Sequence, residues 1–315
     1  MADNVKKATR EAYGEALVEA GEKYPELVVL DADLAAATKT GAFKKAFPDR
    51  FFDVGIAESN MMGVAAGLST TGKKVFASSF AMFAAGRAFE QVRNTIGYPH
   101  LNVKIGATHA GLSVGEDGAT HQCCEDIALM RTIPGMTIIN PADCVEAKKD
   151  VFAALEMDGP VYLRFGRLAV ANVFDDDYTF EIGKANTLKE GTDVAVIATG
   201  LMVGEALEAA EKLAAEGISA KVINMATIKP LDTAAVLAAA KETGAIVTAE
   251  EHSVIGGLGS AVAEAVAEAC PVPVLRVGVQ DTFGKSGPAK EVLALYGLTA
   301  ETIAARAKEA VALKK

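Results

Sequence analysis

The amino-acid sequence predicts an α/β protein made of two consecutive open domains, each with a mostly parallel sheet. Short runs rich in Val and Ile alternate with Ala-rich helical segments along the chain, which is the pattern of βαβ units. The length of 315 residues corresponds to two domains at roughly 100–200 residues each. A chain of this size buries enough surface to fold without disulfide or metal staples.

The first domain is expected over residues 1–170. It opens with a predicted helix at 5–23 and a predicted strand at 27–31. Further strands are predicted at 51–55, 74–79, 102–108, 136–140 and 161–165, with helices at 60–68, 81–96 and 142–157. Strands separated by helices in this way favour a parallel sheet, because each crossover returns the chain to the same end of the sheet.

The pattern lapses at residues 171–192, which are polar and irregular and are interpreted as a linker. It resumes in a second domain over residues 193–315. Strands are predicted there at 193–199, 220–225, 245–249 and 273–279, with helices at 203–216, 231–241, 260–269 and 299–314. The last of these helices has the fullest amphipathic period.

Composition and charge exclude several classes of protein. Hydrophobic residues make up 50% of the chain, and polar positions interrupt every apolar run well before membrane-spanning length, which argues against a disordered or membrane-spanning chain. The net charge of −10 disfavours nucleic acid and anionic membranes as partners, so an anionic substrate would need a local basic pocket. The charged amino-terminal stretch lacks the apolar core of a signal peptide.

The cysteines point to a reducing compartment. The four cysteines are Cys123, Cys124, Cys144 and Cys270, and they form no C-x-x-C pair. This spacing matches neither a zinc ribbon nor a secreted disulfide framework, so a cytoplasmic location is expected.

Glu58 is the first candidate for chemistry. It follows a predicted strand that ends at Gly55 and opens a nearly all-apolar helix. One interpretation is a first-turn carboxylate that complements the helix dipole. The other is a semi-buried carboxyl group whose proton affinity is raised by desolvation, as general acid–base work requires.

The second candidate is the polar, glycine-rich segment at residues 108–122. It contains His109, Asp117 and His121 and follows a predicted strand, at the edge where open α/β sheets bind ligands. Its histidines could hydrogen-bond a sugar hydroxyl or a phosphate, although a loop of turn-forming residues with two solvent histidines is the alternative. A metal site is not predicted, because no metal-ligand spacing accompanies the histidines.

Other residues carry weaker signals. Phe80 and Phe83 follow a strand and are typical of a core, with a stacking platform for a heterocycle as the less favoured interpretation. Arg10 and Arg164 stand isolated in the sequence, where surface salt bridging is the ordinary role and a phosphate clamp the alternative. Two glycine clusters in the second domain, at 199–204 and 256–260, lack the full dinucleotide fingerprint and are interpreted as tight turns.

Three segments together resemble a known family. They are G-I-A-E-S-N at 55–60, A-S-S-F-A-M-F-A-A-G at 77–86 and T-H-A-G-L-S-V-G-E-D-G-A-T-H-Q at 108–122. Their order, continued by N-P-A-D at 140–143 and Y-L-R at 162–164, resembles the carboxyl-terminal half of transketolase over nearly the whole chain. The resemblance implies a pyrimidine-binding domain followed by the family's carboxyl-terminal domain. It also implies a thiamine-diphosphate enzyme that moves a two-carbon ketol unit between sugar phosphates in the pentose phosphate pathway.

The resemblance assigns four residues to the cofactor. Glu58 matches the glutamate that shares a proton with N1′ of the aminopyrimidine, and Phe80 matches the aromatic ring stacked on that pyrimidine. Phe83 matches a tyrosine that lines the same pocket, and Asp33 matches an acid beside the cofactor. The carbanion chemistry belongs to the cofactor, which the protein positions and polarises.

The resemblance assigns five further residues to the substrate. Arg10, His109 and Arg164 match groups that hold the sugar phosphate. Asp117 matches the acid that reads a substrate hydroxyl, and His121 matches a histidine near the reacting carbons.

The sequence also departs from the family pattern. Ala37 stands where a phosphate-binding serine is expected, with Thr38 and Thr40 as possible substitutes, and Ala77 replaces a pocket aromatic. No G-D-G occurs, although that motif holds the diphosphate and its Mg²⁺ in the family. The resemblance therefore implies half of a split enzyme, which needs an amino-terminal partner subunit in an α₂β₂ assembly.

Alternatives remain within and outside this family. 1-Deoxyxylulose-5-phosphate synthase and the beta subunit of a 2-oxoacid dehydrogenase share the glutamate and the two-domain layout. His109 together with Glu116 and Asp117 favours transketolase, because a 2-oxoacid decarboxylase has no polyol chain to read. A catalytically silent partner subunit is the alternative from another class, and a nucleotide-binding second domain is a third.

Overall fold

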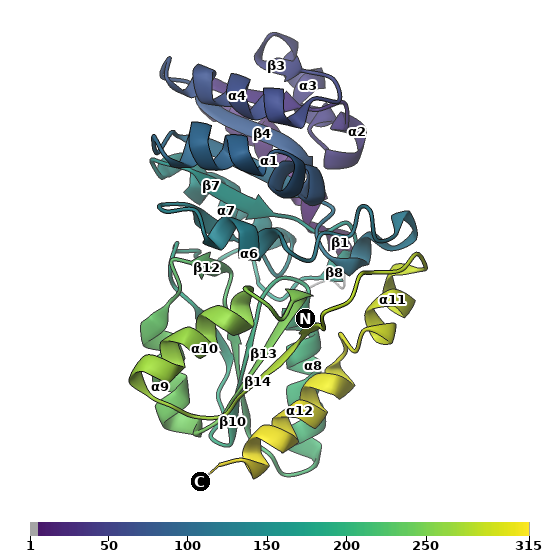
Figure 1. Cartoon of the computed structure of the whole chain (residues 1–315), viewed down its shortest axis with the longest axis vertical. Coiled ribbons are helices and arrows are strands. Elements are labelled where there is room, and N and C mark those ends of the chain that lie inside the picture. The colour runs from purple at the N-terminus through teal and green to yellow at the C-terminus, as the bar shows by residue number, and fades with distance from the viewer. Residues whose placement is uncertain (1–5, 315) are drawn as a thin grey trace.

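The structure is a computed structural model that describes residues 6–314 and contains two stacked α/β domains (Figure 1). The first sheet contains β2 (Leu27–Asp31), β3 (Phe51–Asp53), β4 (Lys74–Phe80), β5 (Val103–Thr108), β6 (Thr137–Ile139), β7 (Val161–Arg164) and β12 (Thr227–Lys229). Their order is β12-β6-β7-β5-β4-β2-β3, and all neighbours run parallel except β12 and β6. The predicted fold class is confirmed. No helix within residues 6–314 has both the length and the apolar character needed to cross a bilayer.

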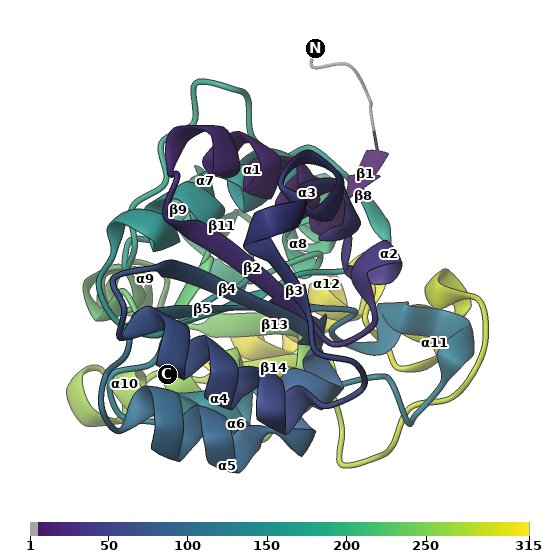
Figure 2. The same ribbon diagram turned by 90° about the horizontal axis from the view of Figure 1, so that it is seen from above.

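Helices cover both faces of this sheet. They are α1 (Thr9–Lys23), α2 (Ala35–Thr38), α3 (Gly41–Ala46), α4 (Glu58–Ser69), α5 (Phe89–Gln91), α6 (Asp126–Arg131) and α7 (Cys144–Glu156). Short 3-10 segments are η1 (Pro48–Arg50) and η4 (Leu112–Asp117), and short π-helical segments are η2 (Met82–Arg87) and η3 (Val92–Gly97). Alternate residues of β2 face opposite layers: Leu27 and Val29 pack with α1 and α7, whereas Val28 and Leu30 pack with α4. Figure 2 shows α1, α3 and α7 on one side of the strands and α4, α5 and α6 on the other.

The second domain repeats this three-layer arrangement on a smaller sheet. Its elements are β9 (Asn186–Lys189), β10 (Val194–Ala198), α8 (Met202–Ala215), β11 (Ala220–Asn224), α9 (Thr233–Thr243), β13 (Ile246–Ser253), α10 (Leu258–Ala269), β14 (Val274–Val279), α11 (Ala289–Leu295) and α12 (Ala300–Ala312). The strand order is β14-β13-β10-β11-β9. Val194 and Val196 of β10 face α8 and α12, and Ala195 and Ile197 face α9 and α10 (Figure 1).

Two short strand pairings connect segments that lie far apart along the chain. β12 leaves the second domain and adds to the first sheet beside β6, with Thr227 opposite Ile139. β1 (Lys6–Ala8) pairs with β8 (Ala169–Ala171) and joins the start of the first domain to its end. The predicted linker at 171–192 contains β9, which forms the edge of the second sheet.

Two predicted helices differ from those observed. The helix predicted at 81–96 is split into η2, α5 and η3. In η2 and η3 the backbone hydrogen bonds join residues five apart, as from Ala88 N to Phe83 O at 3.2 Å. Such wide turns are often found at functional sites. The helix predicted from residue 5 begins at Thr9, because Lys6–Ala8 is extended as β1; residue 5 lies outside the described part of the chain.

Buried carboxyl groups gather where α7 meets the second domain. Glu146 accepts hydrogen bonds from Ala142 N, Tyr178 Oη and Asn224 Nδ2, and burial raises its pKa to about 7. One turn further, both carboxyl oxygens of Asp150 are buried without a hydrogen-bond partner among residues 6–314. Burial raises the pKa of Asp150 well above its ordinary value, with Glu146 adding to the effect.

Asp150→Asn should flatten the dependence of stability on pH. A buried acid with a raised pKa keeps its proton when folded and loses it on unfolding, so its contribution falls as pH rises above the unfolded pKa. The expected difference is a loss of slope of up to about 1.4 kcal/mol per pH unit above pH ~4. Urea unfolding at several pH values measures it, with Asp177→Asn in the exposed linker as the control. Equal slopes in the wild type and Asp150→Asn would contradict the assignment.

Candidate active site

The candidate residues gather at the carboxyl ends of β4 and β5 and at the start of α4. Phe80 is the last residue of β4, His109 follows β5 directly, and Glu58 is the first residue of α4. Carboxyl ends of parallel strands share one edge of the sheet, which brings together residues that are distant in sequence. The sequence-based expectation that Glu58 opens an apolar helix agrees with the structure.

Glu58 is almost completely buried, with 1% of the residue exposed. Its two carboxylate oxygens accept hydrogen bonds from Arg87 Nη1, each at 2.9 Å. Arg87 comes from η2, and its guanidinium also lies 4.6 Å from the centre of the Phe83 ring. Sequence analysis did not select Arg87; the available signal was a cation four residues after Phe83, which is the spacing of helical neighbours.

Arg87 connects Glu58 to a group of aromatic rings. The ring centres of Phe80 and Phe83 lie 5.7 Å apart with nearly parallel planes. The His109 ring stacks on Phe80 at 3.8 Å, and His121 meets Phe83 edge-on at 5.5 Å. Four of the predicted site residues therefore form one aromatic wall.

His109 is held as a neutral ring. Arg10 Nη1 donates to His109 Nε2 at 3.0 Å, so that nitrogen is an acceptor and the proton lies on Nδ1, which is 2.9 Å from Thr108 Oγ1. Burial, together with the charges of Arg10 and Arg167, lowers the pKa of His109 to about 3. The residue adopts a left-handed backbone conformation, with φ of 56°.

Arg167 is a second cation at this position, and sequence analysis missed it. Its guanidinium donates to Glu116 Oε2 at 2.9 Å and to the backbone oxygen of Val114. The backbone N–H of Arg10 donates to the oxygen of Gly166 at 3.4 Å, so the chain at Arg167 runs beside Arg10, and the pKa of Arg10 is lowered by burial and then by the charge of Arg167. Two cations beside a neutral imidazole form a site suited to an anion.

Arg164 lies elsewhere. Its side chain is 3% exposed, and its Nε donates to Asp126 Oδ2 at 2.8 Å. Its Nη2 donates to the backbone oxygens of Cys123 and Glu251, at 3.3 and 2.9 Å. The structure therefore gives the Arg164 guanidinium buried partners and does not bring it into the aromatic group.

Asp117 and Asp33 are the predicted residues with the greatest exposure. Asp117 is exposed at the end of η4, and His121 is partly exposed. Asp33 is exposed with φ of 62°, and its N–H donates to Asp53 Oδ1 at 3.1 Å.

At Ala37, where the family has a serine, the backbone carbonyl takes part in the site instead of a side chain. The carbonyl oxygen of Ala37 accepts a hydrogen bond from Arg10 Nη1 at 2.9 Å. Thr38 and Thr40 are buried, and their hydroxyls donate to Asp31 Oδ2 at 2.7 and 2.9 Å. Both hydroxyls are therefore used as donors to a buried carboxylate, whereas the Ala37 carbonyl contacts Arg10.

A cavity of about 750 Å³ adjoins the aromatic wall. Phe83 and Arg87 line it from the first domain, and residues 279–284 line it from the second. The site is therefore open on the side where Arg87 meets Glu58.

Comparison with known proteins identifies the class and then the family. Residues 5–172 match the family described as Transketolase, pyrimidine binding domain, and residues 183–303 match Transketolase, C-terminal domain. This domain pair is typical of transferase-type enzymes, and its pyrimidine-binding half points to thiamine diphosphate as the cofactor. The chain belongs to the transketolase family.

Similar proteins include subunits of comparable length. A protein named "Putative transketolase C-terminal section" from Methanocaldococcus jannaschii is 53% identical over 97% of this chain and 96% of its own. One of the subunits of an apulose-4-phosphate transketolase from Phocaeicola vulgatus is 42% identical over 99% of both chains. A solved structure described as a split gene transketolase in an inactive beta4 tetramer is 57% identical, with a TM-score of 0.92 over 98% of this chain and 99% of its own.

We predict that His109 stays neutral and carries its proton on Nδ1 from about pH 5 to 8, because burial and two guanidinium groups oppose protonation. Nitrogen NMR of labelled histidine, assigned with His109→Gln, measures the tautomer directly. Arg10→Met should raise the pKa of His109 by removing one of the cations. A wild-type His109 that titrates near its ordinary value of 6.5 would contradict this prediction.

Proposed function

We propose that this chain is one subunit of a split, thiamine-diphosphate-dependent transketolase that transfers a two-carbon ketol unit between sugar phosphates. The observation that carries the proposal is the buried Glu58 carboxylate at the start of α4, which Arg87 connects to the Phe83 ring of the aromatic wall. A buried acid next to an aromatic wall suits a flat heterocycle with a basic ring nitrogen.

The residues present fit the pyrimidine end of the cofactor. When bound, thiamine diphosphate supplies the carbon nucleophile that accepts the ketol unit. Glu58 would share a proton with a pyrimidine nitrogen at its Oε atoms, where Arg87 now donates. The Arg87 side chain is long and half exposed, so its guanidinium can turn from the carboxylate into water, which solvates its charge. Phe80 and Phe83 would orient the ring.

The substrate phosphate is assigned to Arg10 and Arg167. Both lie beside His109, and two guanidinium groups can make charge-assisted hydrogen bonds to a phosphate. The names of two relatives agree with an anionic group on the substrate: one acts on apulose 4-phosphate, and another, 47% identical, is a 6-deoxy-6-sulfo-D-fructose transketolase subunit from Clostridium sp.. Asp117 and His121, in the same loop, would face the sugar chain.

A partner subunit would complete the site. The sequence lacks the G-D-G motif for the diphosphate and Mg²⁺, so this chain fits only the pyrimidine end. The outer face of α4 and the residues just before it offer a docking surface, because the space beyond Gly63 and Gly67 is open and Ile56, two residues before the helix, is 77% exposed. We infer an α₂β₂ assembly with an amino-terminal transketolase subunit, acting in the pentose phosphate pathway in the cytoplasm.

The direct test is ketol transfer between sugar phosphates with thiamine diphosphate and Mg²⁺, comparing this chain alone with this chain plus the amino-terminal subunit. Activity only in the mixture is the expected result. Activity of the chain alone would contradict the partner assignment. A stable complex without transfer would contradict the activity and favour a silent subunit or a synthase of the same family.

Glu58→Ala should lower ketol transfer by at least about 10²-fold, because proton transfer by a positioned side chain contributes on the order of 10²–10⁴. Its melting temperature should stay close to that of the wild type, since Arg87 can return to solvent. Glu58→Gln keeps the shape and should be equally impaired, whereas Glu90→Gln on exposed α5 is the control. Near-normal turnover of either Glu58 variant would overturn the assigned role.

Arg10→Gln and Arg167→Gln should each lower kcat/KM for a phosphorylated donor by roughly 10- to 100-fold, the worth of a hydrogen bond between charged groups. The loss should be several-fold smaller with an unphosphorylated hydroxyketone donor, which has no phosphate to bind. Arg306→Gln on α12 is the control variant. Equal losses on both donors would show that these arginines do not read the phosphate.

A further inference from the structure

The loop at residues 109–122 rests directly on the second domain. Three of its glycines, Gly111, Gly115 and Gly118, have φ of 78°, 79° and 74°, which L side chains rarely adopt. A Cβ at Gly115 would lie 3.1 Å from the backbone oxygen of Gly287, and one at Gly118 would meet the Ser286 side chain. The glycines therefore permit close approach between this loop and the chain around α11.

Glu251 provides the polar part of this contact. It lies in β13 of the second domain, and its residue is 4% exposed. Its Oε1 accepts the N–H of Ser113, the second residue of η4. A Cβ on Gly111 would collide with the same carboxylate, so loop and carboxylate are in direct contact.

Gln122 fixes the other end of the loop by hydrogen bonds. Its side-chain Nε2 donates to the backbone oxygens of Leu112 and Gly115 within the loop, at 3.3 and 3.1 Å. The same nitrogen is 2.9 Å from the backbone oxygen of Lys285 in the second domain. With both ends held, the positions of Asp117 and His121 depend on the second domain.

We propose that Glu251 is a positioning residue, which holds the loop bearing Asp117 and His121 by accepting the Ser113 N–H. The consequence for catalysis rests on the proposed function. The structural effect on the loop does not, because it concerns this chain alone.

Two charged groups, Arg164 and Asp126, act on Glu251 from the first domain. Burial raises its pKa to about 7, while the charge of Arg164 on β7 opposes that shift and Asp126 on α6 adds to it. The backbone oxygen of Glu251 also accepts from Arg164 Nη2. The side chain is therefore enclosed between both domains, where a lost hydrogen bond is not replaced by water.

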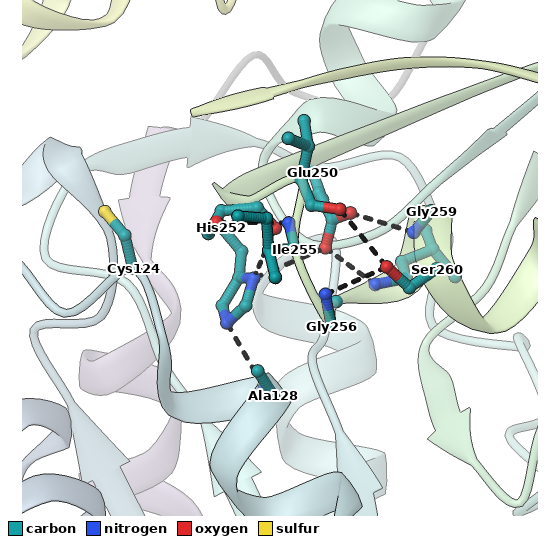
Figure 3. Close-up of polar contacts among 12 residues, drawn as sticks. Cys124, Ala128, Glu250, His252, Ile255, Gly256, Gly259 and Ser260 are labelled. Atoms are coloured by element: carbon teal, nitrogen blue, oxygen red, sulfur yellow. Dashed lines mark hydrogen bonds and ion pairs between the residues drawn. The ribbon is translucent and has the colours of Figure 1, made fainter. Parts of the chain in front are cut away.

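Glu250 offers a matched control. It is also completely buried in β13, and burial likewise raises its pKa to about 7. Its carboxylate points the other way along the pleat and accepts from Leu258 N and Gly259 N, at 2.7 and 2.8 Å, at the start of α10. Figure 3 shows Glu250 facing Gly259, with the side chain of His252 next to it accepting from Ala128 N.

Amide hydrogen exchange of the free chain tests the proposal. Glu251→Ala and Glu251→Asp, which is one methylene too short to reach Ser113, should speed exchange at residues 111–118 at least tenfold. Glu251→Gln keeps an acceptor oxygen and should retain most of the protection. Glu250→Gln should affect only the start of α10. Unchanged loop exchange in Glu251→Ala or Glu251→Asp, or equal loop exchange in Glu250→Gln, would overturn the proposal.

Ketol transfer with the amino-terminal subunit gives the second readout. Glu251→Ala and Glu251→Asp should lower kcat/KM for the donor about tenfold or more, mainly through KM, because the loop binds substrate and Glu58 is untouched. Glu251→Gln should retain most of the wild-type kcat/KM. An inactive wild-type mixture would count against the proposed function, while the exchange data still decide the role of Glu251. Normal KM in Glu251→Ala, with an active wild type, would overturn the positioning role.

Discussion

Arg164 and Asp126 form an ion pair at the junction of the two domains, and the rest of the site depends on it. The guanidinium Nε lies 2.8 Å from the carboxylate, both side chains are almost without solvent contact, and the same guanidinium donates to the backbone of Glu251 in the second domain. Breaking such a pair by removing one partner leaves a buried charge, which costs about 3–5 kcal/mol. The junction is thus restricted to one arrangement, and the loop at residues 109–122 rests on it.

The charge of the site is opposite to that of the whole chain. The net charge is −10, yet Arg10 and Arg167 are neighbours beside a histidine kept neutral. Salt screens the more distant acidic groups over about 8–10 Å, so the nearby guanidinium groups dominate what an anion meets there. The neutral His109 ring fits this arrangement, because it accepts a hydrogen bond from Arg10 without adding a third positive charge. The acidic surface and the cationic pocket are compatible for this reason.

Much of the local structure follows from hydrophobic periodicity. The strands at Leu27–Asp31 and Ala220–Asn224 agree with prediction within a residue, because each is fully buried and has a core of adjacent apolar, mostly β-branched residues. The π-helical turns within residues 81–96 could not be predicted, because an apolar helical pattern does not distinguish ordinary α-helical turns from turns whose hydrogen bonds join residues five apart. β12 was missed because three residues that pair with a distant sheet carry no pattern of their own.

The sequence by itself determined the fold class, the position of Glu58 at the start of a helix, and the presence of His109 and His121 in one loop after a strand. These are local properties, set by residue periodicity and by neighbours along the chain. Only the tertiary structure decided that Arg87 pairs with Glu58, that Arg167 lies beside Arg10, and that Arg164 is enclosed at the domain junction. A charged side chain takes its role from the partners it meets in space, and those partners lie 29 and 38 residues away for Arg87 and Arg164.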